Sequence, residues 1–329
     1  MIRATTFPDR RLAVLLLACL LPLGLAAQRA DKRPKPSGAV VYDLALSPDS
    51  SWLAFIEGFG VHILPLDSGG LPLHWSTQGE HRSIPLAIAY AADGSAIATA
   101  GRDSSILIWD LASQTVRRRL QLHRGIVITL AWSPDGQYLA SGGTDGRVLI
   151  SDAASGELHL DGRAHGSDVT AVAFHPDSYL MASCAADGSI AIWDVASATR
   201  LSLIQTGKLQ QKLQFAQDGS HLYTVGGQGR VGQWNVRQPE RPVEGGGVGT
   251  GPGWNIALSY DRRSQMLAIG GIGRSVRISS PQLKYSYAAR VPVFDLALLF
   301  DETHHRFRLA MATCGRGLLL VDGEDLKVR

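Results

Sequence analysis

The stretch GGTDGRVLISD, Gly142–Asp152, is the key to the fold of this chain, because two other stretches repeat its frame. AGRDSSILIWD spans Ala100–Asp110 and AADGSIAIWD spans Ala185–Asp194, and both end in Trp-Asp where the first ends in Ser151-Asp152. Each stretch has a turn containing Asp or Gly followed by a short apolar run, which is typical of a β-hairpin. Their recurrence predicts a repeat protein.

The repeat continues through the chain at a regular spacing. Aspartates in similar tetrapeptides, such as SPDS, SPDG and HPDS, recur at steps of roughly 40 residues. They are Asp49, Asp93, Asp135, Asp177, Asp218, Asp261 and Asp301. An alternating apolar run precedes each aspartate, and further strand-length runs follow it across tight turns. We therefore expect four-stranded units in a radial array, with the aspartates accepting hydrogen bonds from backbone amides in the turn between the first and second strands.

These units resemble the WD-repeat (WD40) β-propellers. The resemblance is carried by LIWDLAS (Leu107–Ser113), AIWDVAS (Ala191–Ser197), AWSPDGQYLASGGTDG (Ala131–Gly146) and HGSDVTAVAFHPD (His165–Asp177). It covers about residues 39 to 329, and it implies an all-β fold, a seven-bladed β-propeller of four-stranded antiparallel blades. Two routes to closing the ring stay open. Either Leu326–Arg329 forms the outer strand of the last blade, or the chain before Val40 crosses over, although Pro34 and Pro36 disfavour a strand there.

The resemblance also implies a His–Ser/Thr–Asp–Trp network inside a blade. Two units have all four residues, namely His81, Thr99, Asp103 and Trp109, and His165, Ser183, Asp187 and Trp193. The third unit has His123, Ser141 and Asp145 but Ser151 at the Trp position; the fifth has Thr224 and Trp234 but Thr206 for His and Gln228 for Asp. We interpret these sets as structural, because a catalytic triad would occur once rather than at repeat spacing. No catalytic residue, cofactor or metal ligand is predicted.

The turns between the second and third strands, here called the b–c turns, contain recurrent arginines. These are Arg102, Arg147, Arg230, Arg274 and Arg316. In a propeller these turns lie on one face, so five arginines from five blades would form a broken basic ring that binds proteins through acidic peptide segments. The alternative is that they are ordinary turn residues, several of them neutralised by Asp103, Asp145 and Asp187.

The N-terminus has the parts of a secretory signal peptide. Arg10 and Arg11 precede the apolar run Leu12–Ala27, and the chain then becomes polar. This pattern predicts a signal peptide over 1–27, with an uncleaved anchor as the alternative and a lipoprotein signal at Cys19 as a third reading. Residues 28–38 would be a polar linker and residues 39–329 the propeller. The remainder of the chain is then extracytoplasmic, and it would contact the membrane only through an uncleaved anchor.

Composition narrows the class of function. The net charge is +3, and without the segment Met1–Ala27, whose arginines outnumber its single aspartate, the chain is close to neutral. Such a balance disfavours nucleic-acid binding. Cys184 and Cys314 lie far apart in the repeat and are expected to be buried free thiols. The glycine-dense stretch Glu244–Trp254 lacks a phosphate-loop pattern and is expected to be a flexible connection, and His304-His305 a solvated turn.

We therefore expect a non-enzymatic protein-interaction scaffold. The alternative is an exported propeller enzyme or small-ligand sensor that uses the channel mouth. It would require convergent, non-repeating acids or histidines, and the sequence shows none that stands above the repeat pattern. Fold alone does not choose between these functions.

Overall fold

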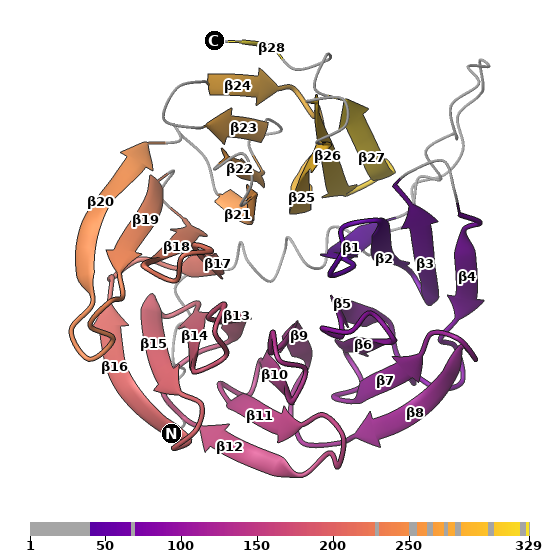
Figure 1. The fold of residues 1–329 in the computed structure, drawn as a ribbon, viewed down its shortest axis with the longest axis horizontal. Helices are drawn as coiled ribbons and strands as arrows, with labels where there is room; N and C mark the ends of the chain where they lie inside the picture. The colour runs from indigo at the N-terminus through magenta and orange to yellow at the C-terminus, as the bar shows by residue number, and fades with distance from the viewer. Residues whose placement is uncertain are drawn as a thin grey trace, which may run out of the picture.

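Seven antiparallel sheets stand around a central axis like the blades of a propeller (Figure 1). A computed structural model describes residues 40–66, 70–227, 230–249, 255–261, 266–272, 276–279, 284–301, 306–322 and 327–328. In these residues every regular element is a strand, and no helix is long and apolar enough to cross a membrane. The predicted all-β, seven-bladed propeller of four-stranded antiparallel blades is confirmed. The predicted signal peptide and linker lie outside the described residues.

The first four blades each have four strands. They are β1 (Val41–Leu46), β2 (Trp52–Glu57), β3 (Gly60–Pro65) and β4 (Leu73–Ser76); β5 (Pro85–Tyr90), β6 (Ala96–Gly101), β7 (Ile106–Asp110) and β8 (Thr115–Leu120); β9 (Val127–Trp132), β10 (Tyr138–Gly143), β11 (Val148–Asp152) and β12 (Leu158–Gly162); and β13 (Val169–Phe174), β14 (Leu180–Ala185), β15 (Ser189–Asp194) and β16 (Thr199–Gln205).

The last three blades have four, five and three strands in the described residues. The fifth contains β17 (Gln210–Phe215), β18 (His221–Gly226), β19 (Arg230–Asn235) and β20 (Val243–Gly249). The sixth contains β21 (Asn255–Asp261), β22 (Met266–Gly271), β23 (Val276–Ser279), β24 (Lys284–Tyr287) and β28 (Lys327–Val328), and the seventh β25 (Val293–Asp301), β26 (Arg306–Thr313) and β27 (Gly317–Asp322).

The innermost strand of each blade borders the central channel, and its side chains pack against both neighbouring blades (Figure 1). For example, Ala87 and Ala89 on β5 share a core with Val127 and Leu130 on β9. All seven innermost strands have a register shift near their first residue. Such bulges change the direction in which the neighbouring side chains point. In the first, fifth and seventh blades the bulge lies next to a charged residue, namely Asp43, Lys212 and Asp295.

The ring closes by packing between the first and seventh blades. A shared core joins Val41 and Leu44 on β1 to Ala297 on β25. The backbone amide of Leu44 donates to Oδ2 of Asp295 at 3.2 Å, which adds a hydrogen bond across the same joint. Side-chain packing therefore joins these two blades.

One of the two routes considered for ring closure is wrong. Residues at the C-terminus do not form the outer strand of the seventh blade, because Lys327 pairs with Ser286 on β24 and so extends the sixth blade. The free edge of β24 offers unpaired backbone groups, and the end of the chain satisfies them. The chain before Val40 lies outside the described residues.

Four of the turn aspartates behave as expected: Asp49, Asp93, Asp135 and Asp218 each accept a hydrogen bond from the backbone amide two residues on. The prediction is wrong for Asp177, whose carboxylate is exposed and whose own amide donates to Nδ1 of His175 at 3.1 Å. The prediction of a flexible connection over Glu244–Trp254 is wrong in its first part. Residues Val243–Gly249 form strand β20, which pairs with β19. An outer strand needs only backbone hydrogen bonds to its neighbour, and glycine residues can form these bonds. Residues 250–254 and His304-His305 lie outside the described residues.

Cys184 and Cys314 are not joined in a disulfide, as predicted. Cys184 is buried, and burial raises its pKa to about 12, so it stays protonated. Cys314 is only partly buried.

Candidate functional site

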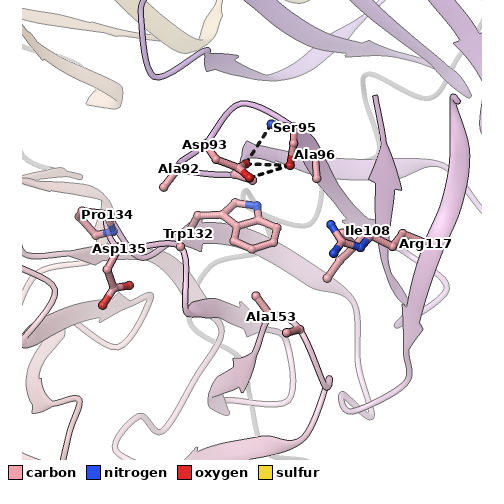
Figure 2. Close-up of a pocket in the computed structure, with 13 residues that line it drawn as sticks. Ala92, Asp93, Ser95, Ala96, Ile108, Arg117, Trp132, Pro134, Asp135 and Ala153 are labelled. Carbon is pink, nitrogen blue, oxygen red and sulfur yellow. Dashed lines mark hydrogen bonds between the residues drawn. The ribbon is translucent and has the colours of Figure 1, made fainter. Parts of the chain in front are cut away.

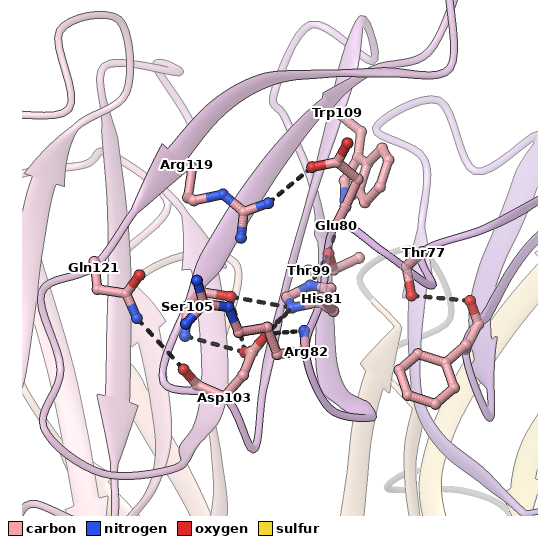
Figure 3. Close-up of polar contacts among 11 residues, drawn as sticks. Thr77, Glu80, His81, Arg82, Thr99, Asp103, Ser105, Trp109, Arg119 and Gln121 are labelled. Atoms are coloured by element: carbon pink, nitrogen blue, oxygen red, sulfur yellow. Dashed lines mark hydrogen bonds and ion pairs between the residues drawn. The ribbon is translucent and has the colours of Figure 1, made fainter.

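The second blade contains a complete His–Thr–Asp–Trp network (Figure 3). Nε2 of His81 lies 2.8 Å from Oγ1 of Thr99, and Nδ1 lies 3.0 Å from Oδ2 of Asp103. The indole Nε1–H of Trp109 donates to the same threonine oxygen at 2.8 Å. Asp103 also accepts the backbone amide of Arg82, which ties the loop before β5 to the b–c turn. Every polar group of the network thus has a partner inside the blade.

The electrostatics of this network favour a neutral imidazole. Burial lowers the pKa of His81, although Asp103 opposes this effect. Burial acts against the charge of Asp103, but hydrogen bonds from Ser105 and His81 outweigh it and lower the pKa of that carboxyl. The aspartate is therefore ionised, Nδ1 carries the proton that it accepts, and Nε2 accepts the threonine hydroxyl. Thr99 is fully buried and its hydroxyl accepts the indole Nε1–H of Trp109, so the set lacks the exposed nucleophile that a catalytic triad needs.

The third and fourth blades vary the same network. In the third, His123 contacts Ser141 at 2.8 Å and Asp145 at 3.0 Å, but Ser151 donates to the carbonyl of Leu139 and does not join the network. Leu120, at the end of β8, stands where Gly162 stands at the end of β12, and Gly162 is the residue against which the ring of Trp193 packs in the fourth blade. A tryptophan at position 151 would therefore meet the side chain of Leu120. Ser151 is therefore a structural substitution rather than a nucleophile.

In the fourth blade a serine is inserted in the network. Nε2 of His165 lies 2.7 Å from Oγ of Ser183, which also accepts the indole Nε1–H of Trp193 at 2.9 Å. Nδ1 of His165 contacts Oγ of Ser189, and that hydroxyl donates to Asp187. Burial lowers the pKa of His165 to about 4.

The fifth blade keeps half of the network. Trp234 donates to Oγ1 of Thr224 at 3.2 Å, but Thr206 replaces the histidine and its hydroxyl is engaged elsewhere, with the carbonyl oxygens of Gly188 and Lys208. A cavity of about 330 Å³ borders Thr206, Thr224 and Trp234.

The five predicted arginines differ in their surroundings. Arg147 is paired with Asp161 through Nε at 2.9 Å and Nη2 at 2.8 Å, and Nη1 donates to the carbonyl of Leu122. Arg102 is half-buried, and its Nε is buried with no hydrogen-bond partner among the described residues, whereas Arg316 is exposed. Only the backbone of Arg230 is described, and Arg274 lies outside the described residues. Arg316 is thus the exposed arginine of this set, and the guanidinium of Arg102 is only partly accessible.

Sequence reasoning missed a charged cluster on the innermost strands. Nζ of Lys212 on β17 lies 3.3 Å from Oδ1 of Asp43 on β1 and 3.1 Å from Oδ1 of Asp295 on β25. The cluster thus joins the fifth blade to the first and seventh. Its members lie at the third position of their strands, where the second, fourth and sixth blades have alanine. The signal in the sequence that could have indicated this cluster is that three blades have a charged residue where three others have alanine.

Each aspartate of this cluster has two tasks. Oδ2 of Asp43 accepts the backbone amide of Ile88 at 2.9 Å, and Oδ2 of Asp295 accepts that of Leu44. In the third blade, the single hydroxyl of Thr129 likewise accepts the backbone amide of Val172, which belongs to the fourth blade. A carboxylate has a second oxygen, and in both aspartates this oxygen contacts Lys212.

The cluster is electrostatically strained. Burial raises the pKa of Asp43 from 3.8 to about 7; Lys212 opposes the rise and the nearby Asp295 adds to it. Burial also acts against the charge of Lys212, but the two carboxylates outweigh it and raise its pKa. A single ammonium therefore faces two carboxyl groups that compete for it, and one of them takes up a proton near neutral pH.

A second cavity, of about 370 Å³, lies between the second and third blades on the face opposite the b–c turns (Figure 2). Trp132 and Arg117 border it together with small alanine side chains, and Asp93 is already engaged by Ser95. Among the described residues, the buried Nε1 of Trp132 has no hydrogen-bond partner. Asp93 and Asp135, the two carboxyl groups that line the cavity, both accept backbone amides of their own turns, so both acids are held as parts of structural turns.

The second, third and fourth blades each contain the network histidine, hydroxyl and aspartate described above. A model of the WD domain, G-beta repeat, matches residues 75–110, 114–152 and 157–194. The chain contains WD40 repeats. Each of the three begins in or before the outer strand of one blade and ends in the third strand of the next, so the repeats interlock neighbouring blades.

No curated protein matches the chain closely enough to count as a relative. Within the described residues no group of three or more His, Cys, Asp or Glu side chains is arranged to hold a metal ion.

Proposed function

We propose that this WD40-repeat protein is a non-enzymatic interaction scaffold, exported from the cytoplasm, that binds other proteins through the b–c turn face. The main support is that the network histidines, hydroxyls and aspartates of the three WD40 repeats satisfy one another inside the blades. The turns that they hold rigid are then the part of the molecule left for recognition. WD40 propellers typically bind other proteins, which agrees with this role.

The partner surface would be centred on Arg316 and Arg102, with Arg230 and Arg274 completing a broken ring. Arginine suits carboxylates because its planar guanidinium donates two parallel hydrogen bonds. Arg147 would contribute charge rather than direct contacts, since three of its nitrogens already donate within the third blade. An acidic peptide segment is the partner that this surface fits.

Charge reversal tests the surface. Arg316→Glu combined with Arg102→Glu should abolish co-purification of partners from extracytoplasmic extract, with folding checked by circular dichroism. Arg241→Glu is the matched control, because this exposed arginine lies on the turn between β19 and β20, on the opposite face. If the double variant keeps every partner of the wild type, the basic surface is not the binding site.

Export has its own test. Protein sequencing of the mature chain from the envelope or medium should begin at Ala27 or Gln28, which corresponds to cleavage after Ala26 or Ala27. Intact chain starting at Met1 in the cytoplasmic fraction would contradict export.

The alternative is a propeller enzyme or small-ligand sensor that uses the channel mouth. The Asp43–Lys212–Asp295 cluster is the kind of convergent, non-repeating set that such a function requires. However, the contacts of all four carboxylate oxygens are with the protein itself. A thermal-shift screen with metals, sugars and quinone-type cofactors separates the two functions. A large, reproducible shift that Asp43→Asn removes would favour the alternative.

A further inference from the structure

The cavity in the fifth blade lies where other blades hold an imidazole ring. His81, His123 and His165 each stand four residues before the first residue of the innermost strand, and Thr206 has the same place before β17. In the three WD40 repeats the ring lies between the hydroxyl of the second strand and the b–c turn. In the fifth blade this region contributes to the cavity of about 330 Å³.

Two substitutions account for the space. A threonine is shorter than a histidine, and the hydroxyl of Thr206 is turned toward the carbonyl oxygens of Gly188 and Lys208. Gly232 stands opposite Thr224 on β19, where the second, third and fourth blades have Leu107, Leu149 and Ala191. A cavity of this volume is at the lower end of the range for small-molecule sites.

The cavity keeps the hydrogen-bonding group that a histidine would use. The hydroxyl of Thr224 is almost completely buried and accepts the indole Nε1–H of Trp234. Among the described residues it has no second partner, so its own proton is free to be donated. In the second, third and fourth blades the corresponding hydroxyl contacts Nε2 of a histidine at 2.7 to 2.8 Å. A buried donor without an acceptor favours a ligand that brings one.

We propose that this cavity is a binding site for a small planar ring with an unprotonated nitrogen, of the imidazole type, which accepts the Thr224 hydroxyl and lies against Trp234. The ring is either a free heterocycle or the histidine side chain of a partner's loop. Lys208, Gln210 and Glu244 also line the cavity. The Gln210 amide donates to Oγ1 of Thr206 at 3.0 Å and to the carbonyl of Lys208 at 2.8 Å, and among the described hydrogen bonds none of the three residues accepts the Thr224 hydroxyl.

Imidazole itself is the first probe. We expect it to shift the indole Nε1–H resonance of Trp234 in a saturable way in NMR spectra of the whole protein, with a dissociation constant on the order of 1 to 10 mM. The Trp234→Phe variant assigns that resonance. Binding should be stronger at pH 8 than at pH 6, because a protonated ring cannot accept the hydroxyl.

Two variants remove the site by different means. Thr206→His supplies the missing ring from the chain itself and should abolish imidazole binding. Thr224→Val keeps the shape of the threonine but removes the donor, and should weaken binding at least fivefold. Thr199→His, the same kind of change at an exposed position of β16, is the matched control and should leave binding unchanged.

The source of the ring is distinguished by a second probe, a blocked Gly-His-Gly peptide. Binding tenfold tighter than imidazole indicates a partner's histidine, and equal or weaker binding indicates a free heterocycle. The proposal is overturned if imidazole shifts no Trp234 resonance, or if Thr206→His binds it as well as the wild type. Tighter binding at pH 6 would also overturn it, because the ligand would then be an imidazolium paired with Glu244.

Discussion

Replacing Asp43 by Asn should remove a pH dependence of stability that the channel cluster creates. The pKa of Asp43 is 3.8 as a free side chain and rises to about 7 in the folded protein. An acid with a raised folded pKa stabilises the fold at low pH, and this contribution is lost as the pH rises from the free value through the folded value. Between pH 5 and pH 8 the loss is about 2 to 3 kcal/mol, on the order of 1.4 kcal/mol per pKa unit.

The asparagine introduced by this change resembles a permanently protonated aspartate. Its oxygen can still accept the amide of Ile88, and its NH₂ group can donate to Asp295. From pH 5 to pH 8 the stability of the variant relative to the wild type should therefore rise by about 2 to 3 kcal/mol. All residues other than residue 43 are the same in the two proteins, so the difference in stability reports on the Asp43 cluster.

Urea denaturation followed by tryptophan fluorescence at pH 5, 6, 7 and 8 measures this difference. Asp49→Asn is the matched control, because hydrogen bonds from Ser47 and Ser51 lower the pKa of Asp49 and it does not titrate in this range. If Asp43→Asn and the wild type lose stability in parallel from pH 5 to pH 8, Asp43 is not protonated near neutral pH and the reasoning fails.

Three further outcomes follow from the same contacts. Lys212→Met should lower the free energy of unfolding by about 3 to 5 kcal/mol at pH 8, because it leaves two buried carboxylates without their cation, and by clearly less at pH 5. Urea denaturation at both pH values measures this; an equal loss at pH 5 and pH 8 would show that the ion pairs are unimportant. Leu120→Ala should lower the free energy of unfolding by about 2 to 5 kcal/mol, because it truncates a buried side chain. Ser151→Trp should also destabilise the protein unless it is combined with Leu120→Ala, since the two side chains would occupy the same space. A more stable Ser151→Trp single variant would contradict this reasoning. His165→Gln should make the protein less sensitive to acid. Because the pKa of His165 is lowered to about 4, the wild type loses up to about 3 kcal/mol of its free energy of unfolding as the pH falls from 7 to 4. Unchanged acid denaturation of the variant would argue against a neutral His165.

The candidate sites were predictable to different degrees. The networks around His81 and His165 were predicted from the resemblance to WD40 repeats, because the four residues recur at the same spacing in these two units. The surroundings of the arginines do not, since Arg147 meets Asp161 only because β11 and β12 are paired. Ser189 entered the fourth network because its hydroxyl lies between Asp187 and His165 in space.

Local sequence was enough to define the architecture: strand-length runs, turn aspartates and a regular repeat period leave a radial array of short antiparallel sheets as the consistent arrangement. Local hydrogen bonds and nearest-neighbour packing suffice for that. The centre of the ring and its joint, in contrast, are set by tertiary contacts alone. Asp43, Lys212 and Asp295 belong to the first, fifth and seventh blades. They meet because a closed ring brings every innermost strand to one channel. Strand β28 pairs with the sixth blade because the outer edge of β24 was free. Contacts across a ring depend on closure, and closure leaves no mark on local sequence.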